Sequence, residues 1–154
     1  MKKVAAKAPN QLRCVVVQFC DDIRHEVGNK VTLVGLYNGS LFLQEFPALI
    51  ARLAINLIVE TSIEDRISDM VVRIEKGEEI IFQTSTSIPP RVASNEVIQA
   101  GHDEPTRSML GVQISLPPIT VMSPCMLRVV VILDGLESIA GKLRIAAMSA
   151  PSIV

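Results

Sequence analysis

Apolar and polar residues alternate with a period close to two along most of this chain. Between residues 50 and 60 every second position is aliphatic, namely Leu53, Ile55, Leu57 and Val59. An α-helix would repeat its apolar positions every 3.6 residues, whereas the side chains of a β-strand point to opposite faces in turn. The pattern therefore predicts a strand with an aliphatic face toward a core and with Asn56 facing outward. Comparable segments occur at 12–20, 30–37, 41–44, 67–74, 78–86, 108–116, 119–122, 126–133 and 137–148.

Three turn sequences are expected to join neighbouring strands into hairpins. Asn38-Gly39 and Asp134-Gly135 supply residues that tolerate the positive φ angles of a two-residue hairpin turn. Gly77 ends a three-residue loop that joins 67–74 to 78–86. Strands of this spacing, separated by Gly and Pro turns, are typical of all-β proteins.

We predict an all-β fold, specifically an antiparallel two-sheet β-sandwich of the Greek-key, immunoglobulin-like or jelly-roll-like kind with about eight or nine strands. Residues 12–148 are expected to form a single domain. Residues 1–11 are predicted to be a flexible N-terminal tail, and residues 149–154 a short C-terminal tail. The stretch 92–100 fits either a strand or a short helix.

Composition narrows the possible functions. The chain has 154 residues, of which 49% are hydrophobic and 20% charged, so it is not expected to be disordered. Its formal net charge is -1 and its basic residues are scattered, which argues against nucleic acid as a partner. The longest apolar run, 48–59, carries Arg52 and is too short to span a membrane. The N-terminal residues lack the apolar region of a secretory signal. A cytoplasmic protein, or a virion protein if the chain is phage-encoded, is therefore expected.

The three cysteines are expected to be free and mostly buried thiols in a reducing compartment. Cys14 and Cys20 lie on one predicted strand, roughly 20 Å apart at about 3.3 Å per residue, which is beyond disulfide reach. Cys125 lies far away in the sequence.

The charged connection between the first two predicted strands is the main candidate for ligand binding. It holds Asp21, Asp22, Arg24, His25 and Glu26. Carboxylates and a histidine this close together can bind a cation, although the spacing of a calcium loop is absent. The alternative is structural, with the aspartates accepting backbone N–H groups and the arginine pairing locally.

Catalysis has little support in the sequence. His25 and His102 are the two histidines that could act as a base, and no serine lies in a nucleophile-elbow motif. No glycine-rich phosphate loop precedes a helix. We therefore predict a protein that is not an enzyme, with no cofactor and with no catalytic or metal-binding residue assigned.

Several predicted strands are apolar on both faces, among them 14–19, 53–59 and 129–133. A single core between two sheets covers one face of each sheet. The remaining apolar side chains need a loop or another chain to cover them, which favours a homo-oligomer or a protein partner.

The stretch from Phe19 to Tyr37 resembles the opening of a family of small uncharacterised bacterial all-β proteins. The resemblance lies in Phe19-Cys20-Asp21-Asp22-Ile23-Arg24, followed by Glu26, Gly28, Lys30, Leu33, Gly35 and Tyr37. The segment from Pro124 to Gly135 is also similar, although Cys125 and Leu127 depart from the Pro-Gly-x-Tyr pattern usual there. The resemblance covers about a third of the chain and implies a small all-β domain without an assigned reaction.

Two hypotheses about function follow. The first is a non-enzymatic β-sandwich that works by assembly or by binding a protein partner, as a phage or bacterial structural component does. The second is a metal- or small-ligand-binding module that uses the acidic loop 21–26 with Asp21, Asp22, His25 and Glu26.

Overall fold

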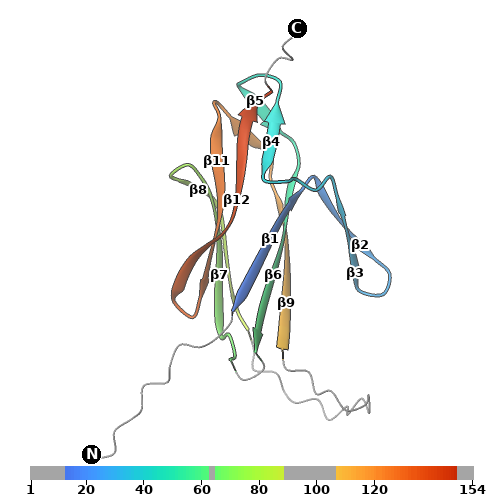
Figure 1. Cartoon of the computed structure of the whole chain (residues 1–154), viewed down its shortest axis with the longest axis vertical. Coiled ribbons are helices and arrows are strands. Elements are labelled where there is room, and N and C mark those ends of the chain that lie inside the picture. The colour runs from blue at the N-terminus through green and yellow to red at the C-terminus, as the bar shows by residue number, and fades with distance from the viewer. Residues whose placement is uncertain (1–12, 63–64, 89–106, 149–154) are drawn as a thin grey trace, which may run out of the picture.

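The structure is a computed structural model that describes residues 13–62, 65–88 and 107–148 (Figure 1). The predicted tails at 1–11 and 149–154, the ambiguous stretch 92–100 and His102 lie outside these residues. Within them the chain is all-β, with twelve strands in four sheets and no helix. The all-β prediction is confirmed. No helix that could cross a membrane is found among the described residues.

The two larger sheets contain eight of the strands. The first has the order β1-β6-β9, with β1 at Cys14–Cys20, β6 at Leu53–Ser62 and β9 at Arg107–Leu116. The second has the order β4-β12-β11-β7-β8. Its strands are β4 at Ser40–Leu43, β7 at Asp69–Lys76, β8 at Glu79–Ser87, β11 at Cys125–Leu133 and β12 at Leu136–Ala147.

Two short ribbons complete the fold. One pairs β5 at Ala48–Ile50 with β10 at Ile119–Val121, and the other pairs β2 at Asp22–Glu26 with β3 at Lys30–Val34. The β2–β3 ribbon projects from the body of the molecule beside the three-stranded sheet (Figure 1). The expected eight or nine strands are fewer than the twelve observed. Two of the unexpected strands are β2, which lies in the connection predicted to be a loop, and β5, which is separate from β6.

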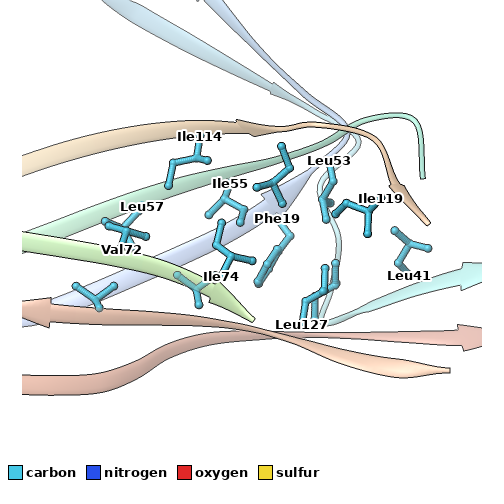
Figure 2. Packing of buried hydrophobic residues seen from close by; sticks show 14 of the residues in the cluster. Phe19, Leu41, Leu53, Ile55, Leu57, Val72, Ile74, Ile114, Ile119 and Leu127 are labelled. Atoms are coloured by element: carbon cyan, nitrogen blue, oxygen red, sulfur yellow. The ribbon is translucent and has the colours of Figure 1, made fainter. Parts of the chain in front are cut away.

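The core lies where the inward faces of the two larger sheets meet (Figure 2). As predicted from the alternation, Ile55, Leu57 and Val59 of β6 are fully buried. Their neighbours in the core include Val72 and Ile74 of β7. The buried aliphatic side chains of both sheets form one cluster, which is the main source of stability in a chain with few aromatic residues.

Two of the three predicted hairpins are present in the structure, and the third is not. The turn at Asp134-Gly135 joins β11 to β12, and both residues have positive φ as expected. β7 and β8 also form a hairpin with Gly77 in the left-handed conformation, but the turn is the two residues between Lys76 and Glu79 and not the predicted three-residue loop. The predicted hairpin at Asn38-Gly39 is wrong. β3 pairs with β2 instead, and β4 pairs in parallel with the distant β12, which buries Leu41 in the core.

At one side of the molecule the two larger sheets come very close. A Cβ atom placed on Gly141 of β12 would lie 2.7 Å from the Cβ of Val17 on β1. The register between β11 and β12 shifts next to this position, between Val129 and Val130, as in a β-bulge. The glycine therefore allows β1 and β12 to approach at a distance that any side chain would prevent.

Candidate functional site

The stretch from Phe19 to Tyr37 folds into a compact structural corner. The Tyr37 hydroxyl donates a hydrogen bond to the Asp21 carboxylate. Gly35 has a positive φ, and the Asp21 carboxylate occupies the place that a side chain at this position would need. The backbone N–H of Tyr37 also donates to the carbonyl of Phe19 at 2.8 Å. The Asp and Gly-x-Tyr pattern of the resemblance is therefore explained by packing, without any ligand.

The electrostatics of this corner fit the same interpretation. Burial, together with the hydrogen bond to Asp21, raises the pKa of Tyr37 above its ordinary value. The hydroxyl group thus stays protonated and remains a donor to the carboxylate at neutral pH. Burial also raises the pKa of Cys20, whose thiol lies within 3.7 Å of the Ala54 carbonyl, so this cysteine is held as an unreactive thiol.

The other acidic residues of the connection have separate partners. Asp22 accepts the N–H of Ile23 at 3.0 Å. Glu26 accepts a hydrogen bond from the Thr32 hydroxyl at 3.1 Å. His25 lies exposed on β2, one residue from Glu26. In the described part of the chain no three Asp, Glu, His or Cys side chains converge to hold a metal ion. The hypothesis of a ligand site at residues 21–26 therefore stays a prediction without supporting geometry.

A second polar cluster joins segments that are far apart in the sequence. Arg13 donates two hydrogen bonds to the carboxylate of Asp65, at 2.7 and 2.9 Å, and a third to Asp134 at 2.9 Å. The other oxygen of Asp134 accepts the backbone N–H groups of Ser68 and Asp69. The bond from Arg13 lowers the pKa of Asp65, and the backbone donors lower that of Asp134. These charged groups are paired with one another and with backbone N–H groups. The cluster of Arg13, Asp65 and Asp134 joins β1, the start of β7 and the β11–β12 turn, and we call it the clamp.

Two hollows lie in the described surface, and neither brings together a nucleophile and a base. One cavity of about 340 Å³ lies between β7, β8 and β9. Among the described residues its lining is apolar apart from hydroxyl groups: Met70, Val72, Thr84, Thr86, Ser87, Ile88, Leu110 and Val112. A second, of about 320 Å³, contains Lys76 and Glu79, but these two pair with each other at 3.1 Å.

The outward faces of the two larger sheets differ in character. On the five-stranded sheet Arg73 lies between Glu75 and Glu137, at 2.8 and 2.9 Å, and Arg128 lies 3.4 Å from Glu75. The aliphatic stems of such arginines can cover neighbouring apolar surface, and Val130, the cross-strand partner of Arg73, is 2% exposed. The apolar outward positions predicted for 129–133 are therefore largely covered within the chain.

The outward face of the three-stranded sheet lies against β2 at one end, where Cys20 is 0% and Ala54 2% exposed, and carries more exposed side chains toward the other end. Val16, Ile58 and Gly111 form one cross-strand row, and Cys14 and Met109 lie at the two ends of the next, with Glu60 between them. Val16 is 45% exposed and Met109 66% exposed. We call Val16, Ile58, Gly111, Cys14 and Met109 the apolar patch. Cys14 is exposed here, so the expectation that the thiols are mostly buried is wrong for this residue, although all three cysteines are free.

A row of amide side chains borders the apolar patch. Asn56 donates to the Gln18 side-chain oxygen at 2.9 Å and accepts from the Gln113 amide at 3.2 Å. We call these three residues the amide ladder. Asn56 is on the outward face, as predicted, but its neighbours leave it only 5% exposed. Sequence reasoning missed the ladder, because its members come from three separate strands, although the polar residue in each apolar strand was a visible signal.

Comparison with protein-family models, with curated proteins and with solved structures found no match.

Proposed function

We propose that this chain is a non-enzymatic assembly or protein-interaction domain whose two larger sheets are the layers of a two-sheet β-sandwich of Greek-key, immunoglobulin-like or jelly-roll-like type, antiparallel except where β4 pairs with β12. A phage or bacterial structural component is the kind of protein that fits this description. Its location in the cytoplasm or in a virion stays a prediction.

The observation that carries the proposal is the apolar patch. Polar residues normally occupy the solvent-facing side of an antiparallel sheet. Here the outward positions on β1, β6 and β9 include Val16, Ile58 and Met109 in adjacent rows. Burying an aliphatic or methionine side chain contributes about 1.5–3 kcal/mol. A partner that covered this patch would therefore gain free energy of binding by removing these side chains from water.

The contrast between the two outward faces supports the same proposal. The outward face of the five-stranded sheet carries the ion pairs of Arg73 and Arg128, which suit contact with water, although Phe42 and Ile139 are also exposed there. Among the described residues, the amide ladder borders the apolar patch, and Glu60, between Cys14 and Met109, is paired with Arg107 at 2.7 Å. A surface with an apolar centre and a polar border is typical of a protein interface.

The test compares two substitutions of valine by glutamate. Val16→Glu places a charge in the apolar patch, whereas Val31→Glu places one on β3 at a position of similar exposure, 40% against 45%. We expect the wild-type protein to run as a complex, with itself or with a co-purified protein, in size-exclusion chromatography with light scattering. Val16→Glu should dissociate this complex and Val31→Glu should retain it. Equal behaviour of the two variants would contradict the proposal.

A further inference from the structure

The outward face of the five-stranded sheet changes character toward its β4 edge. Its ion pairs centre on Arg73 and Glu75 of β7. Closer to β4 the exposed side chains are cations and apolar groups. We infer that this end of the sheet binds an acidic segment of another protein, one that carries apolar side chains among its carboxylates. The surface lies on the other larger sheet from the apolar patch, so the inference goes beyond the proposed function. Its members, which we call the basic surface, are Phe42, Met126, Arg128, Lys142 and Arg144.

The register of the sheet places three cations next to one another. Arg128 of β11 is the cross-strand partner of Lys142 on β12, and Arg144 follows two residues later on the same strand. All three lie on the outward face, since the alternate positions Leu127 and Leu143 are fully buried. Like charges directly opposite each other on neighbouring strands destabilise a sheet. An anionic partner would therefore relieve a repulsion that the folded chain retains.

The carboxylates of the described residues do not neutralise these cations. Arg128 lies 3.4 Å from Glu75, but Glu75 also accepts a hydrogen bond from Arg73 at 2.8 Å. Lys142 and Arg144 are exposed, and neither forms an ion pair with another described residue. This end of the face thus carries an excess of positive charge. Such a field steers partners of the opposite charge to the surface and disfavours partners of the same charge.

Apolar side chains lie among these cations. Phe42 of β4 is 60% exposed and faces outward, because Leu41 beside it is buried. Its partner on β12 is Ala146, two residues from Arg144. Met126 is the cross-strand partner of Arg144 on β11 and is 37% exposed. Aromatic, methionine and arginine side chains are enriched at protein interfaces, so the partner is expected to supply apolar side chains as well as carboxylates.

The composition of the basic surface favours an acidic protein segment over other polyanions. Proteins that bind single-stranded nucleic acid stack successive bases on several aromatic side chains, whereas this surface has Phe42 as its one aromatic residue. Basic clusters that bind anionic membranes contain about four to eight Lys or Arg residues, which exceeds the cations gathered here. A second copy that presented the same surface would be repelled, because cations would face cations.

The test measures the binding of a fluorescently labelled peptide of glutamates with interspersed leucines by fluorescence anisotropy. Lys142→Glu/Arg144→Glu should raise the Kd for this peptide by about tenfold or more, because two attractive charges become repulsive. The control is Arg24→Glu/Arg52→Glu, which changes the net charge equally at two exposed arginines outside the basic surface. Far-ultraviolet circular dichroism and thermal melting verify that each variant is folded.

Two further measurements separate the charged from the apolar contribution. Raising the salt concentration to about 1 M shortens the screening length to about 3 Å, so the Kd of the wild-type protein should rise steeply. The Kd of Lys142→Glu/Arg144→Glu should change much less. Phe42→Ala should raise the Kd by about fivefold, because the contact with an apolar side chain is lost, and should leave the salt dependence as it is in the wild type.

The outcomes decide the inference separately from the proposed function. Binding of the acidic peptide that is lost in Lys142→Glu/Arg144→Glu and retained in the control supports the inference. No binding by the wild-type protein, or equal losses in the two double variants, overturns it. It is also overturned if oligothymidylate or phosphatidylserine vesicles bind to the same residues more tightly than the peptide does. Val16→Glu, which tests the proposed function, should leave binding of the peptide unchanged.

Discussion

The clamp formed by Arg13, Asp65 and Asp134 gives the sharpest prediction about stability. Arg13→Ala removes two hydrogen bonds to Asp65, whose side chain is 6% exposed, and one to Asp134, which keeps its two backbone donors. Breaking a buried ion pair from one side costs about 3–5 kcal/mol, because a charge is left without a partner. Since the Arg13 side chain is partly exposed, we expect the lower end, about 3 kcal/mol.

The free energy of unfolding can be measured by urea titration followed by circular dichroism. A loss of this size should lower the melting temperature by roughly 6–12 °C in a chain of this length. The control is Arg52→Ala, because Arg52 is 78% exposed and 3.9 Å from Asp22, and exposed pairs contribute little. The double variant Arg13→Ala/Asp65→Asn should lose less than the sum of the single losses, since the unpaired carboxylate is gone. A loss for Arg13→Ala no larger than that of the control would refute the reasoning.

The same clamp predicts how stability depends on pH. The folded-state pKa values of Asp65 and Asp134 lie below their ordinary values. The unfolded chain therefore binds protons more readily than the folded chain in this range. The contribution is complete above the ordinary carboxyl pKa of about 4 and is lost as the pH falls through the lowered values. The stability difference between wild type and Arg13→Ala should accordingly narrow from pH 7 to pH 2.5, and a constant difference would contradict this explanation.

Three further predictions concern the glycines and the acidic loop. Gly35→Ala should destabilise the protein more than Gly39→Ala in thermal melting. Both glycines have positive φ, but only at Gly35 does the Asp21 carboxylate occupy the space of a side chain; equal losses would contradict this. Gly141→Ala should also lower the melting temperature, because β1 and β12 must move apart at Val17, and an unchanged temperature would show that the close approach is unnecessary. Calcium or zinc should leave the melting temperature unchanged, since the acidic side chains do not converge; a rise that Asp22→Asn abolishes would restore the ligand-binding hypothesis.

The parts of the fold that could be predicted are those that depend on near neighbours. The alternation in β6 identified its buried face, because the period of a strand is a local property. Asp134-Gly135 identified a true hairpin, since both of its residues adopt the positive φ that the turn requires. The β2–β3 ribbon could have been found in the same way, because Gly28 and Asn29 both have positive φ at its turn.

The errors come from pairings that no local signal records. Asn38-Gly39 has the sequence of a hairpin turn, but only the glycine has positive φ, and β4 gains more by burying Leu41 beside β12. The clamp could not be predicted either, because nothing near Arg13 in the sequence indicates Asp65 or Asp134. For the apolar patch, the sequence indicated only that several strands are apolar on both faces, and not which outward face keeps exposed side chains. Choosing between the two outward faces required knowledge of where Arg73 and Arg128 lie.

The parallel pairing of β4 with β12 has a consequence for how the protein is made. Ser40–Leu43 must wait for residues 144–147 before their hydrogen bonds can form. During synthesis the ribosome releases the N-terminal part of the chain first, and pairings between distant segments form slowly. The five-stranded sheet therefore cannot be completed until residues 144–147 have left the ribosome. Until then, β4 and the apolar strands that follow it are exposed to chaperones and to neighbouring nascent chains.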